Sequence, residues 1–220
     1  MIFVNFKTYQ ESSAQNSLTL ASICYEIAQQ TQISISPVIQ AFDLAPITGG
    51  TKLHPWLQHV DPFEPGAKTG YLTLDAARAW GAAGTILNHS EHTLPFDVLV
   101  KTVERIRTVD QSFPFLICVP DLKTLEKVKM LQPNYIAYEP PELIGSTTGS
   151  VATEQSDVIA AAVDAAEEIP LIVGAGIKSA EDVIISLEKG ARGILVASAV
   201  VKAENQKEKL LELAQAFTAS

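Results

Sequence analysis

Cysteine, runs of basic residues and long apolar stretches are all scarce in this chain of 220 residues. The two cysteines, Cys24 and Cys118, lie far apart without metal-ligand spacing, so we expect buried thiols in a reducing compartment. A net charge of −9 without a basic run disfavours nucleic acid or a membrane surface as a partner. No apolar stretch is long enough to span a membrane, and Met1 leads into a strand-like segment rather than a signal peptide. These features predict a soluble, cytoplasmic protein.

Length and hydrophobic content limit the size of the fold. With 47% hydrophobic residues, the chain can bury one large core, and neither a linker nor a low-complexity segment divides it. We therefore predict a single domain over residues 1–220. The negative net charge still permits a small anionic ligand, which needs only a local cation and some backbone N–H groups.

Short apolar segments alternate with helical patterns along the chain. We predict strands at residues 2–6, 36–41, 56–60, 84–88, 115–119, 135–138, 171–173 and 193–196. This alternation is typical of a single (β/α)8 barrel, the TIM-barrel fold. Residues 42–55 leave too little room for a full helix, so we predict a shortened helical segment after the second strand. A flavodoxin-like or Rossmann sheet is the alternative, disfavoured because no G-x-G-x-x-G motif follows the first strand.

The first helix has a candidate cap and a candidate buried face. Ser12 or Ser13 precedes the helical pattern and is expected to cap its N-terminus. Residues at helical spacing are expected to form the buried face, namely Leu18, Ala21, Tyr25 and Ala28.

An acidic residue ends the sixth predicted strand. The apolar run 135–138 stops at Glu139, and Pro140 and Pro141 prevent the strand from continuing. The C-terminal end of a barrel strand is a favoured position for catalysis, so Glu139 is a candidate general base. Taken alone, the position favours a solvated loop residue, because loops are usually polar.

Polar residues also lie at the ends of the first and fourth predicted strands. Asn5 and Lys7 alternate to the same side of the chain, and His89 and Glu91 follow the fourth strand. By itself, Lys7 fits the start of a solvated loop equally well. In a closed barrel, these strand ends converge on Glu139. A cation, a neutral imidazole and a carboxylate together suit removal of a proton next to a carbonyl, with the enediolate stabilised by Lys7 and His89.

Small residues follow the seventh and eighth predicted strands. They are Gly174-Ala-Gly-Ile177 and Ala197-Ser198, where backbone N–H groups can approach a ligand closely. In barrels, phosphate commonly binds between these two loops, at the start of a short helix such as residues 198–202. The alternative is that the glycines only permit tight turns. The paired position of the two loops favours phosphate binding.

Five motifs occur in the order that is found in one known family. They are Val4-Asn-Phe-Lys-Thr-Tyr9, Asn88-His-Ser-Glu91, Ala137-Tyr-Glu-Pro-Pro-Glu-Leu-Ile-Gly145, Gly174-Ala-Gly-Ile177 and Leu195-Val-Ala-Ser-Ala-Val-Val201. Over essentially its whole length the chain resembles the triosephosphate isomerases, and most of all their short archaeal type. The resemblance implies interconversion of dihydroxyacetone phosphate and D-glyceraldehyde 3-phosphate in glycolysis and gluconeogenesis, with no metal and no organic cofactor.

The same resemblance implies a role for each motif residue. Glu139 is the base, His89 the neutral electrophile, and Lys7 the cation that faces both the phosphate and the enediolate. Asn5 binds substrate, and Glu91 is a buried carboxylate that orders Lys7. The implied lid over the substrate consists of Pro140, Pro141, Glu142, Leu143, Ile144 and Gly145. The implied phosphate-binding amides are those of Gly145 or Ser146, Gly174, Ala175, Ala197 and Ser198.

The resemblance also implies contacts between subunits, and the chain departs from the family pattern at two places. Residues 64–70 resemble a loop that enters a neighbouring subunit, which implies a homodimer or a homotetramer. His92-Thr-Leu-Pro95 stands where the family usually has further polar or arginine residues, so His92 is expected at the surface or an interface. The far hinge of the lid, residues 146–149, is longer by one or two residues. His54 and His59 match no catalytic position and are expected to be structural or exposed.

Two other functions are compatible with such a barrel. One is a phosphate-binding barrel without isomerase activity, which the intact set of Lys7, His89 and Glu139 disfavours. The other is a different sugar-phosphate enzyme, such as a Schiff-base aldolase, which needs a lysine on a later strand. Four lysines that follow the fourth predicted strand fall in helical patterns, namely Lys101, Lys123, Lys127 and Lys129.

Overall fold

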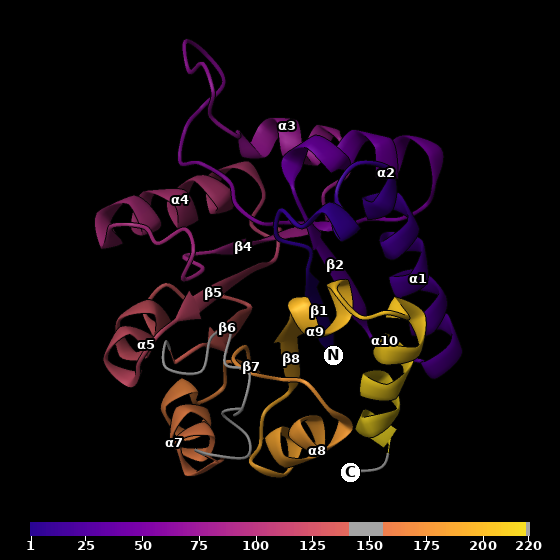
Figure 1. Ribbon diagram of the computed structural model, residues 1–220. Coiled ribbons are helices and arrows are strands. Elements are labelled where there is room, and N and C mark those ends of the chain that lie inside the picture. The colour runs from indigo at the N-terminus through magenta and orange to yellow at the C-terminus, as the bar shows by residue number, and fades with distance from the viewer. Residues whose placement is uncertain (141–155, 219–220) are drawn as a thin grey trace.

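The computed structural model describes residues 1–140 and 156–218. Its strands are parallel and close into a barrel in chain order, from β1 next to β2 around to β8 next to β1 (Figure 1). The strands are β1 (Ile2–Asn5), β2 (Ile35–Ile39), β3 (Trp56–Leu57), β4 (Gly84–Leu87), β5 (Phe115–Val119), β6 (Tyr135–Tyr138), β7 (Leu171–Val173) and β8 (Gly193–Val196). With helices between the strands, the predicted TIM-barrel class is confirmed.

The strands separate two apolar layers. Inside the barrel lies a small core of Phe3, Val38, Trp56, Ile86, Leu116, Cys118, Ala137, Ile172 and Leu195. A larger core lies between the barrel and the helices, and it takes the alternate residues, such as Ile2 and Val4. The alternation of side chains along a strand explains this division. Because Asn5 shares the inward side with Phe3, β1 places a polar side chain at the mouth of the barrel.

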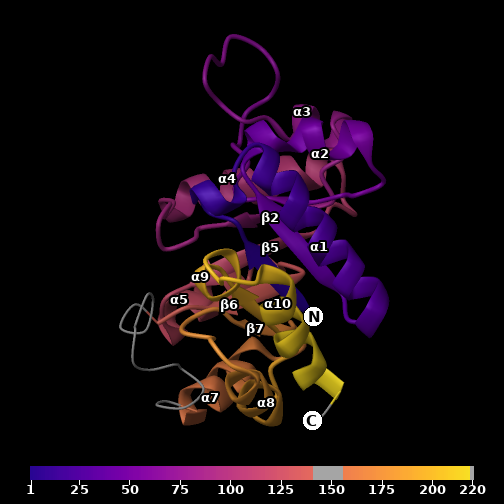
Figure 2. The same ribbon diagram turned by 45° about the vertical axis from the view of Figure 1, so that its right-hand side comes forward.

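The helices cover the outside of the barrel (Figures 1 and 2). They are α1 (Gln15–Thr31), α2 (Leu44–Gly50), α3 (Leu74–Ala79), α4 (Phe96–Val109), α5 (Leu122–Lys129), α7 (Ser156–Ala166), α8 (Ala180–Glu188), α9 (Ser198–Val201) and α10 (Gln206–Gln215). With seven residues, α2 is the predicted shortened segment after β2. Helices α1 and α10 pack side by side. Over residues 1–140 and 156–218, no helix is long and apolar enough to cross a membrane.

The last four strands have the predicted bounds, whereas the first four are shorter than predicted or shifted. β1 and β4 stop early because Lys7 and Asn88 have left-handed backbones, with φ of 47° and 59°. β2 stops at Ile39 because a short 3-10 turn begins at Ala41. β3 keeps only Trp56 and Leu57, since the chain then turns toward the next loop.

The predictions for the first helix were wrong in two respects. Ser12 and Ser13 do not cap α1, because their hydroxyls donate to the carbonyls of preceding residues, and the N-cap position is Ala14. The buried face also differs, since Tyr25 is 52% exposed. The face that packs on the barrel consists of Ser17, Leu20, Ala21, Cys24 and Ile27. The spacing of three and four residues that starts at Leu20 was the better signal.

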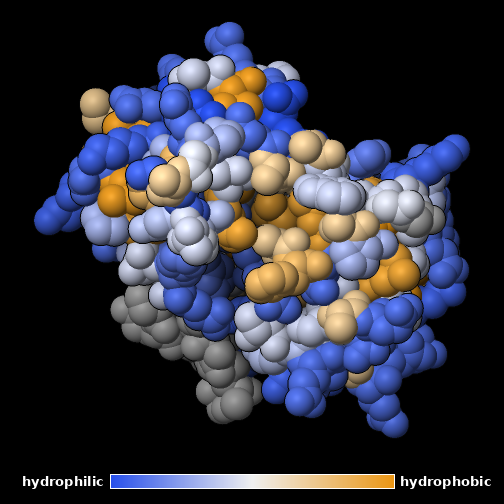
Figure 3. All heavy atoms as spheres, turned by 90° about the horizontal axis from the view of Figure 1, so that it is seen from above, coloured by the Kyte–Doolittle hydropathy of each residue, from blue (hydrophilic) through white to orange (hydrophobic). Residues whose placement is uncertain are grey.

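A long segment between β3 and α3 projects from the barrel (Figures 1 and 2). Its base is closed by a bridge between Asp61 and Thr73, and residues 64–70 are all exposed. Apolar side chains gather beside it over α2 and α3, where the surface is hollowed (Figure 3). Phe42 and Trp80 are the most exposed of them, at 92% and 57%. The segment 64–70 therefore stands next to an uncovered apolar surface.

Candidate active site

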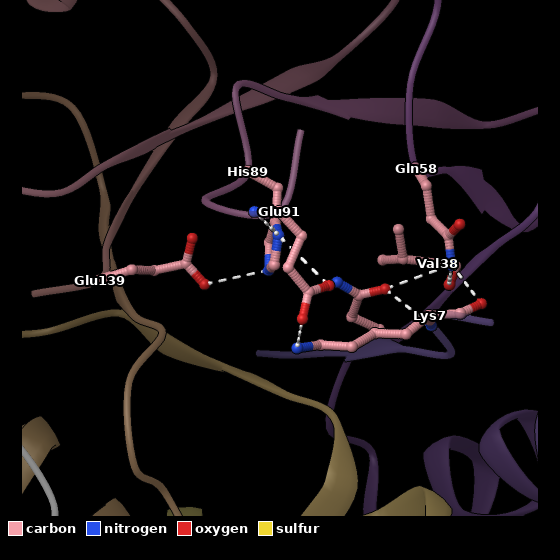
Figure 4. A network of polar contacts seen from close by, with 7 residues as sticks. Lys7, Val38, Gln58, His89, Glu91 and Glu139 are labelled. Carbon is pink, nitrogen blue, oxygen red and sulfur yellow. Dashed lines mark hydrogen bonds and ion pairs between the residues drawn. The ribbon is translucent and has the colours of Figure 1, made fainter. Parts of the chain in front are cut away.

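The carboxyl ends of the strands surround a cavity of about 560 Å³. Five side chains that the sequence singled out line it together, although they come from three different strand ends: Asn5, Lys7, His89, Glu91 and Glu139. Figure 4 shows Lys7, His89, Glu91 and Glu139. Closure of the barrel brings them together, because parallel strands point their carboxyl ends to one side. The cavity is therefore the candidate active site.

Glu139 is held at the edge of the barrel by its backbone and buried by its neighbours. Its N–H donates to the carbonyl of Val119 at 2.9 Å, and its side chain is only 4% exposed. The Oε2 atom is buried without a hydrogen-bond partner among the described residues. Burial raises the pKa of Glu139 to about 7, against the opposing effects of a hydrogen bond from the Cys118 thiol and the charge of Lys7. A carboxylate with this pKa can accept a proton near neutral pH.

Gly174, which follows β7, makes room for this carboxylate. A Cβ atom at Gly174 would lie 2.5 Å from Cγ of Glu139 and 3.0 Å from its Oε1. The N–H of Gly174 donates to the carbonyl of Tyr138 at 3.0 Å. Gly174 therefore contributes to the site by having no side chain. Its backbone N–H is engaged in strand pairing and is not directed to a ligand.

His89 is a neutral imidazole with a defined tautomer. The backbone N–H of Glu91 donates to its Nδ1 at 3.1 Å, so the ring proton is at Nε2. Nε2 lies 3.5 Å from Oε1 of Glu139, across the cavity (Figure 4). Burial, followed by the charge of Lys7, lowers the pKa of His89 to about 4, and the charge of Glu91 opposes this effect. His89 is therefore positioned to donate a hydrogen bond from Nε2 at neutral pH.

The loop that carries His89 is braced by Asn88. Its side-chain amide donates to the carbonyl of Cys118 at 2.9 Å, and its carbonyl oxygen accepts the N–H of Leu94 at 2.9 Å. These two bonds tie the loop to β5 and close it on itself, which offsets the left-handed backbone of Asn88. The orientation of His89 is thus fixed from both sides.

Lys7 forms the opposite wall of the cavity. Its Nζ lies 2.6 Å from Oε1 of Glu91, which gives the predicted contact between these two side chains. The predicted burial of Glu91 was wrong, because its side chain is 57% exposed. Glu91 belongs to the turn after β4, where the chain has already left the barrel and solvent reaches the carboxylate. The backbone N–H of Lys7 donates to Oδ1 of Asn5 at 3.0 Å, which holds the left-handed turn at Lys7.

Gln58 supports this turn and was missed in the sequence. Its Nε2 donates to the carbonyl of Lys7 at 3.0 Å and to Oδ1 of Asn5 at 3.3 Å (Figure 4). A third, longer contact joins it to the carbonyl of Val38 at 3.5 Å. A glutamine one residue after a short strand carries little signal by itself. Only closure of β1, β2 and β3 shows that its amide reaches all three acceptors.

The candidate phosphate loops lie on the same cavity. Gly176, Ala197 and Ser198 line it, whereas Ala175 is buried behind the wall and is absent from the lining. The predicted short helix is present as α9 and begins at Ser198. The sequence did not single out Tyr9, Lys178 and Leu195, which also line the cavity. Tyr9 and Leu195 lie within quoted motifs, and Lys178 follows one directly.

Only the first residue of the predicted lid is among the described residues. Pro140 is buried at the end of β6. The remaining lid residues lie outside the described residues, as do Ser146 and the hinge: Pro141, Glu142, Leu143, Ile144 and Gly145. Among residues 1–140 and 156–218, no group of three or more His, Cys, Asp or Glu side chains could hold a metal ion.

The other histidines lie where they were expected. His54 is exposed and contacts the carbonyl of Gly81, and His92 is exposed on the loop after β4. His59 is 9% exposed and lies 3.2 Å from Asp61, as a structural residue would. None of the three faces the main cavity.

Comparison with known proteins identifies one family over nearly the whole chain. The family model for triosephosphate isomerase matches residues 1–217. The triosephosphate isomerase of Methanocaldococcus jannaschii is 35% identical over 97% of this chain and 98% of its own length. Those of Archaeoglobus fulgidus and Methanothermobacter thermautotrophicus are 35% and 33% identical, again over 97% of this chain and over 96% and 93% of their own lengths.

Proposed function

Because the chain belongs to the triosephosphate isomerase family, we propose that it interconverts dihydroxyacetone phosphate and D-glyceraldehyde 3-phosphate through an enediolate. The observation that carries the catalytic assignment is the buried carboxylate of Glu139. Its pKa is raised to about 7, its Oε2 has no partner among the described residues, and it faces Nε2 of His89 at the mouth of the barrel. This arrangement suits proton transfer between two neighbouring carbon atoms.

Glu139 moves the proton in both halves of the reaction. In the direction from the ketone, its carboxylate removes a proton from the hydroxymethyl carbon, and the electron pair of that C–H bond forms the double bond of the enediolate. The same proton, now on Glu139, is returned to the neighbouring carbon. The hydroxyl proton moves from one oxygen to the other, and the aldehyde results. No atom is gained or lost overall.

His89 and Lys7 stabilise the charge that develops on the oxygens. The Nε2 proton of His89 is directed into the cavity, so it can be donated to the oxygen that becomes negative. A neutral imidazole suits this role because its pKa is lowered to about 4. Lys7 adds a positive charge on the other side, held at Glu91. Asn5 and Gln58 keep the backbone of Lys7 in place.

The phosphate is proposed to bind at the opposite end of the cavity. The candidate donors are the backbone N–H groups of Gly176, Ala197 and Ser198, since these residues line the cavity near the start of α9. Gly176 replaces Gly174 in this role, because the amide of Gly174 is occupied by Tyr138. The lid residues 140–145 with Ser146 are proposed to close over the substrate and exclude water.

The assignment is tested by a coupled assay of triose phosphate interconversion. We expect Glu139→Gln to lower kcat/KM by about 10² to 10⁴, because a positioned general base contributes that much. Glu139→Asp keeps a carboxylate but withdraws it, so a smaller loss is expected. Glu104→Gln, at an exposed position on α4, is the matched control. Activity of Glu139→Gln within about tenfold of the unmodified enzyme would contradict the base assignment.

The segment 64–70 is proposed to contact a second copy of the chain, in a homodimer or a homotetramer. Support comes from its exposure and from the uncovered apolar side chains next to it, among them Phe42, Tyr71 and Trp80. Sizing the protein in solution over a range of concentrations tests this. A monomer at all concentrations would contradict it. A shift toward monomer is expected in Phe42→Ser, because the substitution removes the exposed ring and with it the proposed apolar contact between the two copies.

Residues 1–220 are further proposed to act as one domain in the cytoplasm. Both cysteines are free and buried, which fits a reducing compartment. A small phosphorylated substrate fits the cavity better than a polymer does.

A further inference from the structure

Two histidines outside the catalytic set stack on each other. The rings of His59 and His92 have centroids 4.4 Å apart and planes inclined by 34°. His59 follows β3 and is buried, whereas His92 lies on the exposed loop after β4. The stack therefore joins two loops that the chain order separates by an entire β/α unit.

On one side, the stack is tied to the base of the projecting segment. Oδ1 of Asp61 lies 3.2 Å from Nε2 of His59, and Oδ2 accepts the N–H of Leu72 at 2.7 Å. The backbone N–H of Asp61 donates to the carbonyl of Leu72 at 2.8 Å. A single carboxylate thus holds both His59 and the two ends of the segment 61–72.

On the other side, the stack is tied to the turn that orients His89. The N–H of His92 donates to the carbonyl of His89 at 2.7 Å, which closes a turn over residues 89–92. Within this turn, the N–H of Glu91 donates to Nδ1 of His89. The position of His92 and the ring orientation of the proposed electrophile therefore depend on the same turn.

Charged and titratable groups meet at the stack from three loops. Asp61 faces His59 from its own loop, while Lys7, His89, Glu91 and His92 line a hollow of about 200 Å³ beside it. Burial lowers the pKa of His59, Asp61 opposes this effect, and the charge of His92 adds to it. One charged ring can lie against a neutral one with Asp61 as its counter-ion. Two charged rings at 4.4 Å repel each other.

We propose that the His59–His92 stack is an acid-sensitive latch that fixes the catalytic turn 89–92 against the base of the projecting segment. Protonation of both rings opens it, the turn loses its support, and His89 loses its alignment with the substrate. In this role His92 is a positioning residue, because it acts through His89. The catalytic consequence rests on the proposed isomerase function, whereas the latch itself is independent of it.

The dependence of kcat/KM on pH tests the catalytic consequence. Protonation of Glu139 and of the substrate phosphate lowers kcat/KM at acid pH in every variant, by up to about tenfold per pH unit for each proton. With the latch, protonation of the stack adds a further loss, so the acid limb of the unmodified enzyme is steeper than these two protons alone make it. His92→Phe keeps an aromatic ring but cannot be charged, so we expect near-normal turnover at pH 8 and a less steep acid limb than in the unmodified enzyme, by up to about tenfold per pH unit. His54→Gln, at an exposed histidine outside both loops, is expected to keep the steep limb. Equal slopes in the unmodified enzyme and His92→Phe would overturn the catalytic role.

Proton NMR of the imidazoles tests the latch without any assay. The chain has four histidines, so each ring can be assigned by single substitution. We expect the pKa of His59 to rise in His92→Phe, because a charged neighbour is removed, and to stay unchanged in His54→Gln. An unchanged pKa of His59 in His92→Phe would overturn the latch. A protein without isomerase activity that still shows this rise would overturn the proposed function and leave the latch standing.

Discussion

Two carboxylates on opposite sides of the cavity each face a basic side chain, and their surroundings give them different properties. Glu139 is 4% exposed and lies 3.5 Å from a neutral imidazole, whereas Glu91 is 57% exposed and lies 2.6 Å from the ammonium of Lys7. Burial raises the pKa of Glu139 to about 7. Glu91 remains in contact with solvent, so it can serve as a counter-ion. Two residues of the same type therefore have different surroundings, and burial suits Glu139 to the proposed role of a base while exposure suits Glu91 to that of a counter-ion.

The two sides also hold their reactive groups by different means. The carboxylate of Glu139 has its place because Gly174 lacks a side chain. The backbone of Lys7 has its left-handed conformation because Asn5 and Gln58 bond to it. One side therefore depends on empty volume, and the other depends on hydrogen bonds. Substitutions that fill the space beside Glu139 and substitutions that remove the hydrogen bonds at Lys7 should consequently lower activity to different extents.

Gly174→Ala should have the largest effect. The added Cβ would lie 2.5 Å from Cγ of Glu139, so the base must move, and we expect kcat/KM to fall by about 10². The change is measured in the coupled assay, with thermal unfolding recorded on the same sample. In Gly49→Ala, the control, the new Cβ meets nothing within 4 Å, and activity should be retained. A loss below about threefold in Gly174→Ala would show that Glu139 tolerates the displacement.

The stability of the protein should depend on pH through Glu139. Glu139 titrates near its ordinary pKa of 4.5 in the unfolded chain and near 7 in the folded protein. The folded state thus binds the additional proton between these values. The stabilisation this provides is complete below about pH 4.5 and is lost as the pH rises through about 7.

Replacing Glu139 by Gln removes this dependence. Between pH 5 and pH 8, the free energy of unfolding of Glu139→Gln should therefore rise by roughly 2 kcal/mol relative to the unmodified protein. Urea unfolding at several pH values measures this change. Parallel pH profiles for Glu139→Gln and the unmodified protein would mean that burial does not shift Glu139.

Gln58→Met should have the smallest effect of the three. The substitution keeps the length of the side chain but removes the bonds to the carbonyl of Lys7 and to Asn5, so we expect kcat/KM to fall by about tenfold. Lys7→Met should lose more, because the cation itself is removed. Gln40→Met is the control, since its amide donates to Ser13 and lies outside the cavity lining. If Gln58→Met matched Gln40→Met, Asn5 alone would suffice to hold the turn.

Much of the barrel could be predicted because its signals are local. The strands at 115–119, 135–138, 171–173 and 193–196 are short apolar runs bounded by turns, and their shortness favours a strand over a helix. Where the backbone turns left-handed, at Lys7 and Asn88, the same signal extended the strands too far. The buried face of α1 was misplaced because Tyr25 has an apolar ring, although it faces solvent.

The sequence by itself determined which side chains meet in the cavity, because motif order and strand ends specify Lys7, His89 and Glu139 without knowledge of distances. Only the tertiary structure decided how each one behaves. The raised pKa of Glu139, the tautomer of His89, the exposure of Glu91 and the contact from Gln58 all depend on neighbours brought together by barrel closure. Burial and hydrogen bonding act through space, so the order of residues in the chain does not record them.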